Sequence, residues 1–300
     1  MKRPATLALL AMLVVGCEPT LDQRLSLIDA PRVLAVISEP AETRPQQAAS
    51  HRVWIASSQG IVSADVTWAF CTEPKPPTED NVVNARCLAD AVRVIGTGAL
   101  ITATTPSDAC MRFGPDISDS TFRPRDPDGT GGYYQPLRLT LPVELGSQTE
   151  LAFASHRIGC GLANAPAQVS RDYRERYVGN RNPPAPELLG VAGESPWTMR
   201  VGERVELTAS WTDEAAETYL WFDRSDGQLR DRRESLRLSW YGTAGSFCSD
   251  VTGRAEGERE TFTENCWRAP MQPGSVTLWL VLRDSRGGAA LREVSVEVTP

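Results

Sequence analysis

Two carboxylates and a run of turn residues make Arg125-Asp-Pro-Asp-Gly-Thr-Gly-Gly132 the stretch of the chain best suited to hold a ligand. Asp126 and Asp128 stand at alternate positions before Gly129, which is how a calcium-binding loop begins. No further carboxylate follows for a dozen residues, so the complete calcium pattern is missing. The alternative is a glycine-rich loop whose aspartates cap its own backbone. We therefore expect either a calcium site at Asp126 and Asp128 or a plain turn.

Cysteine is the next residue type that could carry chemistry, and six of the seven cysteines lie beyond residue 70. They are Cys71, Cys87, Cys110, Cys160, Cys248 and Cys266. An even number predicts disulfides if the chain is exported. The last two pair with each other if the two halves of the chain fold separately. The first four allow three connectivities, and we favour Cys71–Cys87 with Cys110–Cys160, because Cys71 ends one predicted strand and Cys87 precedes the next.

A zinc site is the competing interpretation of these cysteines. No Cys-x-x-Cys spacing is present, and only His51 and His156 could add an imidazole ligand. Disulfides are therefore the favoured prediction.

The N-terminus indicates the compartment. Met1-Lys-Arg3 precedes an apolar run from Ala5 to Val15, and the sequence continues Val14-Val-Gly-Cys17. This is the pattern of a secretory signal that ends in small residues. An apolar run of about 11 residues is well short of the roughly 20 that cross a bilayer. An anchor helix is therefore disfavoured.

The end of this signal resembles the lipobox of bacterial lipoproteins, in which the cysteine sulfur is acylated and the signal is cut before it. The resemblance implies that residues 1–16 are removed and that Cys17 carries the lipid which attaches the protein to a membrane. Residue 18 is Glu rather than Asp, so the inner-membrane retention signal known for enterobacterial lipoproteins is absent. We therefore expect an outer-membrane protein, on the periplasmic face or at the cell surface.

Charge and composition exclude some partners. The chain has 31 basic and 38 acidic residues, and the loss of Lys2 and Arg3 with the signal leaves 29 basic residues and a net charge of −9. Such an acidic body has no excess of cations to displace the counterions of nucleic acid, so we expect no nucleic-acid partner. A hydrophobic content of 41% and a charged content of 23% are typical of a globular protein.

Period-2 alternation predicts short strands along nearly the whole chain. In residues 64–70, Val66, Trp68 and Phe70 fall on one face, as in a half-buried strand. Further strands are predicted over residues 32–37, 51–56, 91–95, 100–104, 135–141, 150–158, 187–191, 204–211, 218–222, 236–241, 275–283 and 291–298. Helical periodicity is confined to residues 167–177, which we predict to form one short surface helix.

The segment Asn180-Arg-Asn-Pro-Pro-Ala-Pro186 has the composition of a domain linker. It divides the chain into a tether over residues 17–30, a first β-sandwich over 31–179 that includes the short helix, and a second β-sandwich over 187–300. The second ends in a hairpin around the turn Asp284-Ser-Arg-Gly-Gly288. The predicted fold class is all-β, with two tandem Ig-like β-sandwiches.

The opening strand Val201-Gly-Glu-Arg-Val-Glu-Leu-Thr-Ala-Ser-Trp211, together with residues 276–298, resembles bacterial Ig-like domains and domains of the polycystic-kidney-disease type. As a whole, the chain resembles the outer-membrane lipoproteins that are numerous in myxobacteria and their relatives. This resemblance implies a surface or envelope protein and assigns no catalytic residue.

Trp279 is the residue we single out as a candidate for binding. By strand alternation it shares a face with Thr277 and Val281 rather than with Leu278 and Leu280. Of the tryptophans, it is the one whose side chain could be exposed, where it could stack on a sugar ring or anchor a protein partner. The favoured interpretation is that a loop of the sandwich covers it.

Signatures of hydrolases are absent from the sequence: there is no Gly-x-Ser-x-Gly elbow and no His-Glu-x-x-His helix. His156 could be paired with a serine only in principle. We therefore predict a lipid-anchored, non-catalytic envelope or surface protein that serves as a spacer or as a binding module for protein or polysaccharide, with no cofactor other than the calcium considered above. The alternatives are an accessory subunit of an envelope enzyme or export machine, and a divergent hydrolase.

Overall fold

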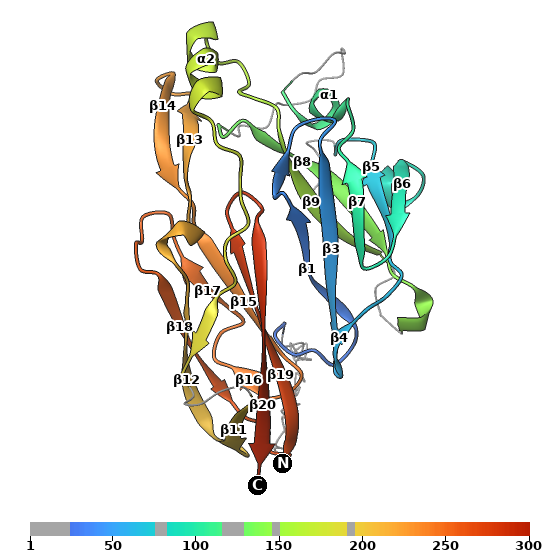
Figure 1. Cartoon of the computed structure of the whole chain (residues 1–300), viewed down its shortest axis with the longest axis vertical. Helices are drawn as coiled ribbons and strands as arrows, with labels where there is room; N and C mark the ends of the chain where they lie inside the picture. The colour runs from blue at the N-terminus through green and yellow to red at the C-terminus, as the bar shows by residue number, and fades with distance from the viewer. Residues whose placement is uncertain (1–24, 76–82, 116–128, 146–150, 191–195) are drawn as a thin grey trace, which may run out of the picture.

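Strands dominate the computed structural model of the chain (Figure 1). It describes residues 25–75, 83–115, 129–145, 151–190 and 196–300. The described helices are short: α1 (Ala109–Phe113), α2 (Ala167–Arg176) and the 3₁₀ turns η1 (Ala85–Leu88), η2 (Val143–Leu145) and η3 (Asp213–Ala215). The predicted all-β class is confirmed, and α2 lies where the sequence predicts a helix. None of the helices within these ranges is both long and apolar enough to span a membrane.

The first half of the chain is a sandwich of two sheets. One sheet has the order β1 (Arg32–Glu39), β3 (Ala48–Ser57), β4 (Gly60–Val62), with β7 (Leu100–Thr104) also paired to β3. The other has the order β2 (Glu42–Thr43), β9 (Leu151–Gly159), β8 (Gly132–Thr140), β5 (Thr67–Cys71), β6 (Val92–Thr97). Alternate side chains from both sheets meet in one core, among them Val53, Ile55, Ile101, Trp68, Phe70 and Leu137. The side chains of Trp68 and Phe70, which the sequence places on one face of a strand, thus point into this core.

The second half is also a sandwich. One sheet has the order β10 (Glu187–Leu189), β12 (Arg204–Ser210), β18 (Phe262–Arg268), β16 (Ser246–Phe247). The facing sheet has the order β11 (Trp197–Arg200), β20 (Ala289–Thr299), β19 (Gly274–Asp284), β15 (Leu236–Gly242), β17 (Val251–Arg254). The core between them contains Leu207, Trp267, Leu238, Trp240, Leu278 and Leu280. The predicted closing hairpin is β19–β20, paired from Gly274–Val298 to Arg283–Ala289.

A further hairpin, β13 (Thr218–Asp223) with β14 (Gln228–Arg233), forms a two-stranded sheet of its own. It extends from the second sandwich and lies beside α2 of the first half (Figure 1). The Phe222 amide donates to the Gly129 carbonyl at 2.8 Å. A Cβ at Gly129 would lie 2.5 Å from the Phe222 carbonyl, so only glycine permits this close approach.

The two sandwiches pack against each other through the outer faces of their sheets. Because β19 is the middle strand of its sheet, its alternate residues point in opposite directions: Leu278 and Leu280 enter the core of the second sandwich, whereas Trp279 and Val281 face the first. They meet side chains of β1 and β3 and of the segment before β1. The buried members of this second apolar layer are Ile28, Leu34, Ala35, Ala56, Trp279 and Val281.

The candidate binding site at Trp279 is therefore wrong, because this side chain is covered, by the first sandwich rather than by a loop. Its side chain is 0% exposed, and its indole nitrogen donates to Glu293 Oε2 at 2.7 Å on the neighbouring strand β20. The alternation placed Trp279 on the outer face of its sheet, but the first sandwich covers that face.

Residues 26–28 are fixed to the second sandwich, although the sequence predicts that residues 17–30 are a tether. The Ile28 amide donates to the Gly242 carbonyl, and the Gly242 amide donates to the Ser26 carbonyl, each at 2.9 Å. Ile28 is buried in the layer between the sandwiches. The chain therefore contacts its C-terminal half before it enters the first sandwich.

We predict that Trp279→Ala lowers the free energy of unfolding by about 3 to 5 kcal/mol, because it leaves a large cavity between the two sandwiches. Chemical denaturation followed by tryptophan fluorescence measures this loss. Val143→Ala is the control, since Val143 is 80% exposed and a surface substitution changes stability by about 0.5 kcal/mol or less. A loss below about 1 kcal/mol for Trp279→Ala would contradict the packing between the sandwiches.

Candidate functional site

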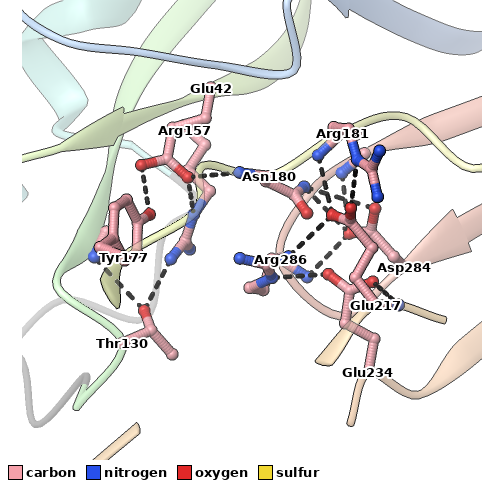
Figure 2. A network of polar contacts seen from close by, with 12 residues as sticks. Glu42, Thr130, Arg157, Tyr177, Asn180, Arg181, Glu217, Glu234, Asp284 and Arg286 are labelled. Carbon is pink, nitrogen blue, oxygen red and sulfur yellow. Dashed lines mark hydrogen bonds and ion pairs between the residues drawn. The ribbon is translucent and has the colours of Figure 1, made fainter. Parts of the chain in front are cut away.

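The junction of the two sandwiches holds a chain of buried charged and polar side chains (Figure 2). The segment 180–186 crosses from α2 to β10 at this place. Groups from β2 and β9 approach it from the first sandwich, and groups from the ends of β15 and β19 approach it from the second.

On the side of the first sandwich, the Glu42 carboxylate collects three donors. It accepts from Arg157 Nε at 3.0 Å, from the Asn180 amide at 2.9 Å and from the Tyr177 hydroxyl. The side chains of Glu42 and Arg157 are 4% and 1% exposed, so this is a buried ion pair. Arg157 also donates to Thr130 Oγ1 at 2.7 Å. With several partners each, the two charges are compensated.

Arg157 is accommodated because the neighbouring strand has a glycine beside it. A Cβ at Gly132 would lie 2.1 Å from the Arg157 guanidinium carbon. An alanine at this position would displace the guanidinium from Glu42. The last glycine of the stretch 125–132 thus makes room for a buried cation.

On the side of the second sandwich, the Arg286 guanidinium lies between two carboxylates. Its Nε donates to Glu234 Oε1 at 2.6 Å and a terminal nitrogen donates to Glu217 Oε2 at 2.9 Å. The side chains of Arg286 and Glu234 are 3% and 0% exposed. Glu217 also pairs with the exposed Arg181. Arg286 is therefore the buried cation that holds this part together.

The Asp284 carboxylate closes the turn that the sequence predicts between the last two strands. It accepts from the amides of Arg286 and Gly288, both at 2.8 Å. It also accepts from Asn180 Nδ2 at 3.3 Å, which links the turn to the crossing segment. Burial raises the pKa of Asp284 above its ordinary value.

Glu234 is the carboxyl group of the junction with the most perturbed titration. Burial, and next the nearby charge of Asp284, raise its pKa from 4.5 to about 7, although Arg286 acts in the opposite direction. The labelled network contains four carboxyl groups, those of Glu42, Glu217, Glu234 and Asp284, and three guanidinium groups, those of Arg157, Arg181 and Arg286. One proton on Glu234 would make the network neutral.

The segment 180–186, predicted as a domain linker, is bonded to both sandwiches. Besides Asn180, Asn182 donates through Nδ2 to the Ser38 carbonyl at 2.7 Å and accepts from the Ala289 amide at 3.0 Å. Ser38 belongs to β1 and Ala289 to β20. The segment 180–186 thus has the composition of a linker, but its hydrogen bonds hold the two sandwiches in one arrangement.

The two histidines are paired inside the first sandwich. His51 Nδ1 lies 2.8 Å from Ser38 Oγ, and His156 Nε2 lies 2.8 Å from Thr43 Oγ1, with ring centroids 5.0 Å apart. Burial lowers the pKa of His51 from 6.5 to about 4 and that of His156 to about 3. The histidines and both hydroxyl partners are buried, so these contacts stabilise the sandwich interior.

A pocket of about 500 Å³ opens beside Glu42, between α2 and the end of β9. Its wall includes Tyr173 and Tyr177, whose ring centroids are 4.8 Å apart. The Tyr173 hydroxyl donates to the Thr130 carbonyl at 2.7 Å. Burial raises the pKa of both phenols, so they are neutral at physiological pH. Arg44 and Arg174 also line the pocket.

The three disulfides have the connectivity favoured from the sequence. Cα–Cα distances are 5.4 Å for Cys71–Cys87, 5.5 Å for Cys110–Cys160 and 5.2 Å for Cys248–Cys266. The first joins β5 to η1, the second joins α1 to the residue after β9, and the third stays within the second sandwich. Cys160 also lines the pocket.

The remaining predicted residues are Asp126, Asp128, Cys17 and Trp279. Asp126, Asp128 and Cys17 lie outside the described residues, so the calcium site and the lipidation stay predictions. Among the residues that the structure describes, no group of three or more histidine, cysteine or carboxylate side chains could hold a metal. Trp279 lies in the layer between the sandwiches.

Sequence reasoning missed the charged members of the junction. The detectable signal is weak: a charge within a predicted strand is unusual, whereas a charge in a turn is ordinary. Arg157 falls within the predicted strand 150–158, and Arg286 falls in the middle of the predicted hairpin turn. Their partners Glu42 and Glu234 are 115 and 52 residues away along the chain, which no local pattern connects.

Comparisons with known proteins find similar solved structures only at low sequence identity and low TM-score. No family model and no curated protein matches the chain. Among solved structures, fibronectin(III)-like modules of Clostridium thermocellum CbhA are 11% identical, with a TM-score of 0.23, over 90% of this chain and 94% of that one.

Two further solved structures are similar at the same level. Escherichia coli alpha-2-macroglobulin activated by porcine elastase is 12% identical, with a TM-score of 0.24, over 92% of this chain and 22% of that one. A nucleoside hydrolase-related hypothetical protein from Saccharophagus degradans, associated with carbohydrate metabolism, is 18% identical, with a TM-score of 0.21, over 39% of this chain and 26% of that one. These similarities carry no residue and no activity across to this chain.

We predict that Arg286→Met lowers the free energy of unfolding by about 3 to 5 kcal/mol at pH 8, because Glu217 and Glu234 lose their buried cation. Adding Glu234→Gln should restore part of this loss, since one uncompensated charge is then removed. Chemical denaturation of the single and double variants measures both effects. Arg181→Met is the matched control: it removes the exposed partner of the same Glu217, and we expect a loss of about 1 kcal/mol or less. Equal losses for Arg286→Met and Arg181→Met would contradict the assigned role of Arg286.

The buried histidines predict a loss of stability in acid. Their pKa values are lower in the folded chain than the ordinary 6.5, so the stabilisation is complete above pH 6.5 and is lost as the pH falls toward about 4 for His51 and about 3 for His156. The displacement for His51 corresponds to roughly 3 kcal/mol. The pKa of Glu234 is raised in the folded chain, so the pH dependence of its contribution is opposite. Its stabilisation is complete below pH 4.5 and is lost as the pH rises through about 7.

Denaturation between pH 4 and pH 8 separates these contributions. His51→Gln and His156→Gln should each flatten the fall in stability between pH 6.5 and pH 4. Glu234→Gln should gain stability relative to the wild type as the pH rises from 4.5 to 8. If a histidine variant loses as much free energy of unfolding between pH 6.5 and pH 4 as the wild type does, the replaced imidazole does not titrate as a buried group.

Proposed function

We propose that this protein is a lipid-anchored, non-catalytic module of the bacterial outer membrane that presents two locked β-sandwiches as a binding unit. The observation that carries the proposal is the junction. The two sandwiches share a buried apolar layer, and the segment between them is bonded to both. A body held in this way presents its surfaces at a fixed distance and orientation, which a flexible tandem array does not.

Three disulfides support an oxidising compartment for this body. Such bonds persist in exported proteins and are rare in the cytosol. The small residues before Cys17 and the Glu at position 18 support lipid attachment and delivery to the outer membrane.

The path of the N-terminal segment supports an orientation. Residues 26–28 are bonded to Gly242, at one end of the seven-residue strand β15. The other end of β15, Leu236, pairs with Asp284 of the junction. The two ends are separated by about 20 Å. The chain thus leaves the second sandwich at the Gly242 end, and only eight residues join Cys17 to Leu25. We infer that this end lies toward the membrane and that the junction lies toward the other side.

The lipid anchor is tested by Cys17→Ala. We expect the wild-type protein in the outer-membrane fraction and the variant in the soluble fraction, because the acyl chains supply the attachment. Membrane separation and immunoblotting measure the distribution. Glu18→Asp is the matched control: it keeps the lipid, and we expect it in the inner membrane of an enterobacterial host. Retention of Cys17→Ala in the membrane would overturn lipid anchoring.

A further inference from the structure

The pocket beside Glu42 has an unused positive charge. Arg44 and Arg174 both line it and are exposed, and neither has an ion-pair partner within the described ranges of the chain. By contrast, the nearby Glu42 carboxylate is fully engaged by Arg157, Asn180 and Tyr177. Two guanidinium groups in a protein whose formal net charge is −7 are a local exception that favours an anionic ligand.

The other walls of the pocket favour a sugar as the body of this ligand. Its lining is more polar than apolar, unlike the sites of most drug-sized apolar ligands. Tyr177 is the half-buried aromatic side chain of the wall, and Tyr173 lies buried behind it with ring centroids 4.8 Å apart. Aromatic faces such as that of Tyr177 pack on sugar rings. Toward the described residues, the Ser170 hydroxyl makes one long contact of 3.5 Å, with the Ala165 carbonyl, and can exchange this for a ligand hydroxyl. The volume of about 500 Å³ lies within the range of small-molecule sites.

The pocket is also a built feature of the fold. The Cys110–Cys160 disulfide fixes one side, because Cys160 is itself part of the lining. Tyr173 and Tyr177 are held from behind by Thr130 and Glu42. The groups that shape the wall are thus in place before any ligand arrives.

We propose that this pocket binds an acidic saccharide, with Arg44 and Arg174 on the carboxylate of a uronic acid and Tyr177 against its ring. The assignment rests on the proposed function as a non-catalytic binding module and names the ligand class of that module.

Calorimetry on the full-length, detergent-solubilised protein tests the assignment with trigalacturonate as the probe. The same trisaccharide with its carboxylates methyl-esterified is the neutral control. We expect trigalacturonate to bind at least tenfold more tightly than its ester, and added salt to weaken the binding. Arg44→Gln and Arg174→Gln should each raise Kd about tenfold. Arg237→Gln, which removes an exposed arginine of the second sandwich, should leave Kd unchanged. Each variant must keep the wild-type Tm.

Several results overturn the assignment. They are no binding of trigalacturonate, equal binding of the ester, or a Kd that neither pocket variant changes. Inorganic sulfate that binds as tightly as trigalacturonate would reduce the site to a simple anion site. A tripeptide with a free carboxylate that binds more tightly than the saccharide would reassign it to peptides. Chromatography of the probe after incubation separates the two proposals, because cleavage would overturn the non-catalytic role while supporting the ligand class.

Discussion

The structure depends on one strand, β19, whose central residues are buried on both faces of its sheet. Leu278 and Leu280 fill the core of the second sandwich, and Trp279 and Val281 pack on the first. Because residues 278–282 are buried on both sides, the first sandwich is a necessary cover rather than an independent neighbour. The burial of this apolar layer stabilises a single relative position of the halves. The N-terminal residues 26–28 extend the same layer.

Charged side chains lie at the edge of this apolar layer, and they are buried away from water. Arg157 and Arg286 are each almost completely buried: Arg157 donates to carboxylate and hydroxyl oxygens, and Arg286 donates to two carboxylates. A buried ion pair contributes little net stability compared with an apolar equivalent, but removal of one partner is strongly unfavourable. These groups therefore contribute less to net stability than to the specificity of the arrangement of the two sandwiches. The halves can meet only where the donors and acceptors match, which is why the crossing segment has a fixed path.

The same geometry gives the molecule two different ends. The N-terminal segment is held at the Gly242 end of β15, whereas the crossing segment, α2 and the β13–β14 hairpin gather at the other end (Figure 1). The pocket with Arg44 and Arg174 belongs to this second end and shares Tyr177 with the polar network. Ligand contacts there act on a wall that the junction already holds, so the pocket needs little reorganisation when a ligand binds.

Local pattern determined much of this architecture. Period-2 alternation located the strands around Trp68 and Trp240, and the even count of cysteines with their positions between strands led to the observed pairing. The residues 167–177 were recognised as helical for the same reason, because helix and strand periods are properties of neighbouring residues. Tertiary structure decided the rest. Alternation assigned Trp279 to the outer face of its sheet, and only the packing of a distant segment buried that face. A Pro-rich composition marked 180–186 as a linker, but its bonds go to β1 and β20. Glu42 and Arg157 became partners across 115 residues because burial requires a charge to find its counterion wherever the fold brings one.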